Sequence, residues 1–196
     1  MPVSAFTGAS SGIGAACRAQ DARAGAAGLL GAGSRVLGTG EVSARDVQEA
    51  MRALEAVDDP SDGQLRQLAD AAVARSRAER RKIPGFGHPI HVHGDPRTER
   101  ALRIAREEGY YGRHLRFAQH LAQSLSAAMG RPLPLNATGS TAAVLLDLGL
   151  DPEFGKALTL IGRVAGLVAH AFEERSRPIG QDLWDMAAAA SESGEP

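Results

Sequence analysis

The 196-residue sequence predicts an all-α fold, and three observations carry that prediction. Hydrophobic residues make up 43% of the chain and aromatic residues only 4%, with alanine and leucine supplying most of the apolar side chains. These two residues favour helices, whereas the β-branched residues typical of strands are few. Apolar side chains also recur at helical spacing in several segments, and no stretch shows the sustained alternation of a half-buried strand.

Charge and cysteine content narrow the class of protein. The net charge is −1, from 22 basic and 23 acidic residues, which gives no indication of a nucleic-acid or membrane partner. Cys17 is the only cysteine, so an intramolecular disulfide is excluded and a reducing compartment fits. No apolar run approaches the roughly 20 residues that span a bilayer, and the N-terminus does not resemble a signal peptide. We therefore expect a soluble, cytoplasmic protein.

Turn and capping residues divide the chain into helices. An Ala- and Gly-rich segment predicts a helix that ends at Gly31 and Gly33 and approaches another backbone closely. Ser43 predicts the N-cap of the next helix, because Asp46 follows three residues later. Asp95 and Pro96 predict the cap and first residue of a later helix that Gly109 ends. Further helices are expected over about 63–81, 115–125, 137–148 and 152–176, the last with an apolar face through Leu158, Ile161, Ala165 and Val168.

Residues 7–14, TGASSGIG, resemble the glycine-rich phosphate-binding turn of short-chain dehydrogenases. Such a turn needs a buried strand before it and a βαβ alternation after it, and the sequence shows neither. The Tyr-x-x-x-Lys pair of that family is also absent. We therefore favour a small-residue terminus over a dinucleotide site.

The stretch from 81 to 97, RKIPGFGHPIHVHGDPR, is the segment most suited to holding a ligand. Gly85 and Gly87 allow close approach of the backbone to a ligand, and three prolines stiffen the loop. One hypothesis is a metal site formed by His88, His91 and His93, but only Asp95 offers a fourth ligand. We expect no metal and prefer a substrate loop.

Three motifs, in order along the chain, resemble those of the citrate synthase family. They are PGFGH at 84–88 followed by DPR at 95–97, NATG at 136–139, and GRVAGLVAHAFE at 162–173 followed by Arg-Pro at 177–178. Residues 28–34, GLLGAGS, occupy the place of a further glycine-rich motif. The sequences of these segments are most similar to those of short citryl-CoA lyase-like members, and the resemblance covers about residues 24–186.

The resemblance implies a citrate-synthase-like helical fold, made of the small domain plus the C-terminal part of the large domain. We expect a poorly defined N-terminal segment at 1–27, the helical domain at 28–186 and a flexible tail at 187–196. The implied reaction is carbon–carbon condensation of an acyl-CoA with an oxaloacetate-like 2-oxo dicarboxylic acid, or the reverse cleavage. The CoA thioester would be a substrate, so no separate cofactor is expected, and the family forms homodimers.

The resemblance also implies roles for individual residues. His88 would be catalytic, polarising the carbonyl of the oxo acid, while Arg97 and Arg163 would bind substrate carboxylates. The backbone from 83 to 87 would bind CoA, with basic residues near 80–82 available for its phosphates. The CoA-binding residues would be Ile83, Pro84, Gly85, Phe86 and Gly87.

Several positions depart from the family pattern. Thr138 stands where the family has an aspartate that serves as the base, and Gly31 stands where it has a second histidine. Val92 occupies a position that is often basic in the family, and the chain is about half the usual length. A threonine hydroxyl is no general base near neutral pH, so we expect impaired catalysis. The alternative is a non-catalytic relic or fragment of the family that binds CoA or a carboxylate.

Overall fold

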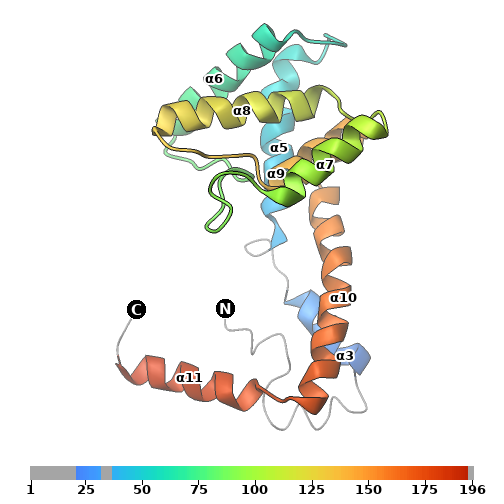
Figure 1. Ribbon diagram of the computed structural model, residues 1–196, viewed down its shortest axis with the longest axis vertical. Coiled ribbons are helices and arrows are strands. Elements are labelled where there is room, and N and C mark those ends of the chain that lie inside the picture. Colours follow the sequence, from blue (N-terminus) through green and yellow to red (C-terminus); the bar gives the residue numbers. More distant parts are fainter. Residues whose placement is uncertain (1–20, 32–36, 194–196) are drawn as a thin grey trace. The chain divides into compact units, whose positions relative to one another are not determined.

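The computed structural model describes residues 21–31 and 37–193, and over these residues it consists of helices joined by loops (Figure 1). The all-α prediction is confirmed. An isolated bridge between Phe86 and Leu135 is the only β-type pairing in the described part. The chain divides into two compact units, of which unit 1 comprises residues 1–36 and 158–196 and unit 2 comprises residues 37–157. Each unit is described by itself.

Unit 2 is a bundle built around its last complete helix. Its elements are α5 (Thr39–Met51), the 3₁₀ turn η1 (Arg52–Leu54), α6 (Asp62–Ala78), α7 (Pro96–Glu107), α8 (Arg113–Met129) and α9 (Ala137–Asp147). Helix α9 contacts α5, α7 and α8, and α6 packs along α8 (Figure 1). The loop between α6 and α7, which contains the motif at 84–88, therefore belongs to a packed unit.

Two apolar clusters form the core of unit 2. In the larger cluster, Met51, Leu65 and Phe117 join α5, α6 and α8, and each is at most 1% exposed. The smaller cluster contains Leu115 and Leu135, and Phe86 packs against both clusters. Burial of such side chains contributes about 1.5–3 kcal/mol each, so the substrate-loop motif is anchored through Phe86 to the best-packed part of the chain.

The structure confirms the predicted cap at Asp95 and shows a further cap at Ser61. Asp95 caps α7 and Pro96 is its first residue. Helix α6 begins after Ser61, whose hydroxyl accepts from the Gln64 backbone while the Gln64 side chain accepts from the Ser61 N–H. Both caps satisfy backbone donors that a helix leaves unpaired.

The prediction that Ser43 caps a helix is wrong. Helix α5 begins four residues earlier, at Thr39, because the Val42 N–H already bonds to the carbonyl oxygen of Gly38. Ser43 is buried inside the helix, and its hydroxyl donates to the carbonyl oxygen of Pro84 at 3.2 Å. The Ser43 hydroxyl therefore stabilises the 81–97 loop and does not cap a helix.

Unit 1 contains α3 (Asp21–Leu30), most of α10 (Phe154–Ser176) and α11 (Gly180–Ser193). Helix α3 ends just before Gly31, as predicted, while Gly33 and the glycine-rich residues 7–14 lie outside the described residues. A Cβ on Gly28 would lie 2.8 Å from Leu167 Cδ2, so this glycine meets a side chain where the sequence predicted a backbone. Helix α11 reaches Ser193, and residues 187–193 are helical where a tail was expected.

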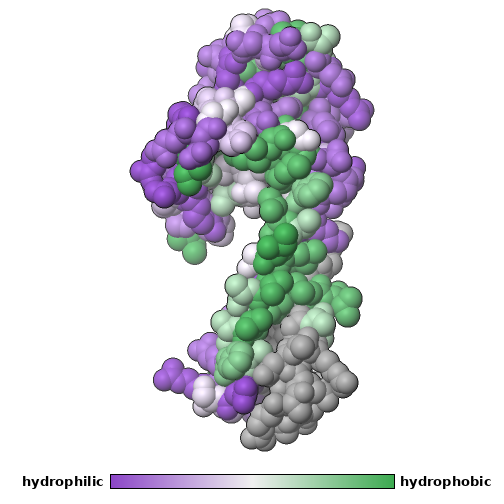
Figure 2. Space-filling model, turned by 90° about the vertical axis from the view of Figure 1, so that its right-hand side faces the viewer, coloured by the Kyte–Doolittle hydropathy of each residue, from purple (hydrophilic) through white to green (hydrophobic). Residues whose placement is uncertain are grey.

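The apolar face predicted for α10 exists, and the residues that the structure describes leave it exposed. Leu158, Ile161, Val168 and Phe172 are between 41% and 69% exposed. Figure 2 shows this hydrophobic surface along the helix. Helical periodicity identifies which face of a helix is apolar. Whether that face is buried depends on a neighbouring element that packs against it. Among the described helices, none combines the length and apolar character needed to cross a bilayer.

Candidate functional site

The loop that follows α6 is held against the N-terminus of α9 by two glycines. Gly85 has φ 97°, a value that suits glycine, and a Cβ there would lie 2.8 Å from the Cα of Gly139. A Cβ on Gly139 would in turn overlap the carbonyl oxygen of Gly85. The loop and the helix thus approach backbone to backbone, at a distance that no other residue permits without a shift.

Hydrogen bonds fix the same junction. The Asn136 N–H donates to the Gly85 carbonyl oxygen at 3.0 Å, and its side-chain amide donates to that of Gly87 at 2.8 Å. The Gly87 N–H donates to the Pro134 carbonyl oxygen at 2.8 Å. Asn136 Oδ1 also accepts from the backbone N–H groups of Thr138 and Gly139, which caps α9. One asparagine therefore joins the loop to the helix.

The hydrogen bonds of His88 assign its tautomer. Its Nδ1 atom accepts from the backbone N–H groups of Ile90 and His91, each at 3.1 Å. A nitrogen that accepts carries no proton, so the proton of the neutral imidazole lies on Nε2. The His91 ring packs against the His88 ring with centroids 4.7 Å apart. His88 therefore presents an N–H donor away from the loop backbone.

Asp95 holds the guanidinium of Arg97. Its carboxylate, 1% exposed, accepts from Arg97 Nε at 2.9 Å and from Arg97 Nη2 at 2.8 Å. It also accepts from the backbone N–H groups of Arg97 and Ala137, so it bridges the first turns of α7 and α9. The hydrogen bonds from the Arg97 side chain hold the pKa of Asp95 well below its usual range; burial opposes that shift, and the two backbone donors add to it. The same pair raises the pKa of Arg97.

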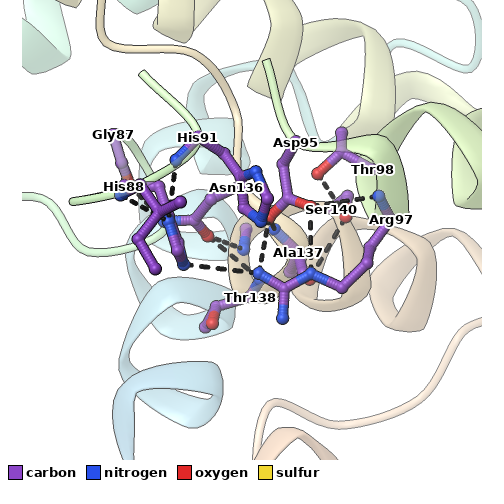
Figure 3. A network of polar contacts seen from close by, with 12 residues as sticks. Gly87, His88, His91, Asp95, Arg97, Thr98, Asn136, Ala137, Thr138 and Ser140 are labelled. Carbon is purple, nitrogen blue, oxygen red and sulfur yellow. Dashed lines mark hydrogen bonds and ion pairs between the residues drawn. The ribbon is translucent and has the colours of Figure 1, made fainter. Parts of the chain in front are cut away.

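Two hydrogen-bond donors meet beside this pair. Arg97 Nη2 lies 3.4 Å from His88 Nε2 (Figure 3). Because Nε2 carries the proton, this nitrogen cannot accept from Arg97, and both groups are donors toward the same region. Asp95 occupies the Nε–Nη2 edge of the guanidinium, which leaves the Nη1–Nη2 edge for a second carboxylate. The arrangement suits a ligand that offers a carbonyl or carboxylate oxygen.

The other predicted residues divide between the two units. In unit 2, Ile83, Pro84, Gly85, Phe86 and Gly87 lead directly to His88, and Thr138 lies in the first turn of α9. Gly31 and Arg163 belong to unit 1, where Gly31 follows α3 and Arg163 is exposed on α10. The structure thus brings His88, Arg97 and Thr138 into one unit, and Arg163 and Gly31 into the other.

The basic residues before the loop are not equivalent. Arg81 Nη1 donates to both carboxylate oxygens of Asp46, at 2.9 and 2.8 Å, which raises the pKa of Arg81. This arginine therefore fixes the loop to α5. Arg80 has φ 51°, and both it and Lys82 are exposed. Of the basic residues considered for CoA phosphates, these two remain available.

The histidines of the loop do not form a metal-ligand group. In the described part of the chain, no cluster of three or more His, Cys, Asp or Glu side chains could hold a metal ion. The Nδ1 atom of His88 is not available as a metal ligand, because it accepts hydrogen bonds from the backbone of the loop.

Sequence reasoning missed the two residues that organise the site. Both residues were named within motifs, Asp95 as a helix cap and a possible fourth metal ligand and Asn136 as the start of a helix. The two helix assignments are correct, but they do not include the contacts that organise the site. The sequence offers one signal for Asp95, because an arginine two residues after an aspartate can return its side chain to that carboxylate. No local signal indicates that Asn136 also reaches Gly87, 49 residues away.

Similar proteins are known. The family model of the citrate synthase C-terminal domain matches residues 38–181. Citrate synthase 2 of Bacillus subtilis (strain 168) is 28% identical over 108 residues, which cover 51% of this chain and 27% of that protein. The citryl-CoA lyase of Hydrogenobacter thermophilus has a similar structure, with a TM-score of 0.69, 31% identity, and coverage of 90% of this chain and 68% of the lyase.

A second solved structure agrees in fold. The ATP citrate lyase of Methanothrix soehngenii, in complex with citrate and coenzyme A, gives a TM-score of 0.63 at 22% identity over 89% of this chain and 30% of that protein. The matched region of the family model includes the motif at 84–97 and the one at 136–139. The chain belongs to the citrate synthase family and carries its C-terminal domain.

Proposed function

We propose that this chain binds an acyl-CoA and a 2-oxo dicarboxylic acid such as oxaloacetate, and takes part in carbon–carbon condensation or cleavage between them. The observation that carries the proposal is the pair of donors 3.4 Å apart, His88 Nε2–H and Arg97 Nη2. Two fixed donors next to each other stabilise an oxygen that gains negative charge, as the carbonyl oxygen of an oxo acid does on attack. By resemblance to the family, the active form would be a cytoplasmic homodimer.

In this proposal the side chains of the loop have separate tasks. His88 Nε2–H polarises the carbonyl oxygen, and the free edge of Arg97 binds a carboxylate of the same molecule. By resemblance to the family, Arg163 in unit 1 would also bind a substrate carboxylate, and the backbone from Ile83 to Gly87 would bind the CoA. Preorganisation by Asp95 keeps Arg97 in place before the substrate arrives, which lowers the cost of binding.

The alternative is a protein that binds these ligands without efficient catalysis. Condensation requires a base that removes a proton from the acyl methyl group, and Thr138 offers only a hydroxyl. Gly31 likewise provides no side-chain donor for the enol oxygen. Loss of one such group typically lowers the rate by about 10²–10⁴.

Measuring thiol release distinguishes catalysis from ligand binding without catalysis. Purified protein is mixed with acetyl-CoA and oxaloacetate, free CoA thiol is followed with time, and the binding of each ligand is measured by calorimetry. Catalysis predicts thiol release above the uncatalysed rate that is lost in a His88→Ala variant. Ligand binding with no release would establish the non-catalytic alternative, and the absence of both would refute the proposal.

Thr138→Asp tests the missing base directly. The substitution places a carboxylate in the first turn of α9, where the helix dipole favours a negative charge. We expect the rate of thiol release to rise about a hundredfold. Thr141→Asp is the matched control, because Thr141 is exposed on the same helix and should leave the rate unchanged. Equal rates in both variants would remove Thr138 from the proposed site.

A further inference from the structure

A cavity of about 430 Å³ lies in unit 2, at the end of α9 opposite Asn136. Its walls come from the turn before α6, the connector between α7 and α8, the first turn of α8 and the end of α9. Helix α9 spans 11 residues, so its two ends are about 16 Å apart and the cavity is distinct from the loop that contains His88. The volume lies within the range of roughly 300–1,000 Å³ that holds small ligands.

Asp147 fixes the ring of His114 at this cavity. Its carboxylate, 3% exposed, accepts from the backbone N–H groups of Gly112, His114 and Leu115 at 2.9–3.1 Å and from His114 Nδ1 at 2.8 Å. Because the carboxylate oxygens act as acceptors throughout, the proton of the neutral imidazole lies on Nδ1. Nε2 is then an acceptor, and it has no hydrogen-bond partner among the described residues. A ligand with an N–H or O–H donor can supply that partner.

Two charged side chains of the lining lack an ionic partner among the described residues. Arg113 donates Nη1 to the carbonyl oxygens of Val57 at 2.9 Å and Leu54 at 3.4 Å, but it pairs with no carboxylate in that part of the chain. Asp58 is exposed and makes neither a hydrogen bond nor an ion pair there. A guanidinium held by carbonyl oxygens keeps its charge, and its remaining N–H groups can bind a carboxylate.

The other charges of the lining are balanced within the chain. Arg116 pairs with Asp59 at 2.6 Å and with Asp62 at 2.8 Å, and Asp147 accepts the donors described above. In all, three carboxylates and two guanidinium groups line the cavity, so a ligand with several negative charges would be repelled. The lining therefore favours a ligand with one carboxylate and one cationic donor over a dicarboxylate.

We propose that this cavity binds a small α-amino acid as its zwitterion. The carboxylate pairs with Arg113, and the ammonium group donates to Asp58 and to Nε2 of His114. Tyr111 and Leu146 supply apolar surface for the side chain of the amino acid. The inference is independent of the proposed function, because no residue assigned to that function lines the cavity.

Calorimetric titration with three matched ligands tests the proposal. Leucine has both charged groups, 4-methylpentanoate lacks the ammonium group and 3-methylbutylamine lacks the carboxylate, while the hydrocarbon part stays the same. We expect saturable binding of leucine, and binding about tenfold weaker or more for each analogue, because each loses a charge-assisted contact. Equal affinity for leucine and either analogue would overturn the assignment of a zwitterion, and no binding of leucine would overturn the site.

Two substitutions test the individual contacts. Asp58→Asn should leave folding unchanged, since Asp58 is exposed, and should weaken leucine binding about threefold without weakening that of 4-methylpentanoate. Arg113→Gln should weaken leucine binding about tenfold or more. The control is Arg77→Gln, which removes an exposed arginine from the last turn of α6 and should leave the affinity unaltered.

Nuclear magnetic resonance gives a readout that does not depend on the stability of a variant. In the unmodified protein, leucine should shift the ring nitrogen resonances of His114 and leave those of His88 unchanged. Shifts at His88 alone would contradict a site at the start of α8. An unaltered leucine affinity in both Asp58→Asn and Arg113→Gln, or an equal loss in Arg77→Gln, would contradict it as well.

Discussion

Glycine has opposite surroundings in the two units. Gly139, at the start of α9, meets the backbone of Gly85 so closely that no side chain fits between them. Gly162, in the middle of α10, has no atom of another described segment within 4 Å of the position that a Cβ would take. Both are helical glycines in motifs of the citrate synthase family. The residue type alone does not say whether a glycine permits a contact, since the neighbouring element decides.

Apolar side chains show the same contrast. On α9, Ala142, Ala143 and Leu145 are at most 2% exposed. On α10, whose apolar residues also recur at helical spacing, Ile161 is 69% exposed and Phe172 is 57% exposed. Unit 2 contains the partners of its helices, whereas the described part of unit 1 leaves one face of α10 open. Four substitutions test how much of the stability depends on that difference.

Gly139→Ala should have the largest effect. In an open helix this substitution stabilises by about 1 kcal/mol, but here the added Cβ meets the carbonyl oxygen of Gly85. A backbone atom cannot move aside as a flexible side chain can, so we expect the free energy of unfolding to fall by about 3 kcal/mol. Denaturant unfolding followed by circular dichroism measures it. An unchanged midpoint would contradict the tight junction between loop and helix.

Asp95→Asn should rank second. Asparagine can still cap α7, but it loses the ion pair with Arg97, and we expect a loss of about 2 kcal/mol at pH 7. The folded-state pKa of Asp95 lies below its unfolded value of about 3.9, so its stabilisation is complete above that pH and disappears as the pH falls below it. The stability curves of the two proteins should therefore converge in acid.

The exposed pair on the same helix provides a control for Asp95. Arg103 and Glu107 lie 3.9 Å apart and are both more than half exposed, so Glu107→Gln should change stability far less. Parallel curves for Asp95→Asn and the unmodified protein from pH 7 down to pH 3 would contradict a depressed pKa at Asp95.

The fold could be predicted largely from the sequence because its signals are local. Helical spacing and the Asp95-Pro96 cap need no knowledge of distant residues, and both predictions are confirmed. The error at Ser43 has a non-local cause, since its hydroxyl is used by Pro84, 41 residues away. The apolar face of α10 was located correctly from the sequence, but its exposure could not be, because periodicity contains no information about the partner of a helix.

The candidate site was predictable only as a set of residues. Motif spacing identified His88 and Arg97, and the structure places them together. The tautomer of His88 and the ion pair between Asp95 and Arg97 do not follow from residue types. Both depend on how the chain orients these groups after folding.

Gly162→Ala is the matched counterpart of Gly139→Ala and should act in the opposite direction. Among the residues that the structure describes, nothing obstructs a Cβ at this position, and alanine is more favourable than glycine in a helix interior by about 1 kcal/mol. We expect a small gain in stability and in helix content, measured by thermal unfolding in the far ultraviolet. A loss of stability would show that another element closely approaches α10.

Ile161→Gln should have the smallest effect. A side chain that is 69% exposed loses little by becoming polar, so we expect a change in the free energy of unfolding of less than about 0.5 kcal/mol. The measurement is repeated at several protein concentrations, with Ala143→Gln in the core of unit 2 as the destabilising reference. A loss of about 2 kcal/mol that is independent of concentration would mean that the same chain covers α10, and a loss that grows with concentration would mean that a second chain does. Either result would end the contrast between the two units, because α10 would then have a partner as α9 does.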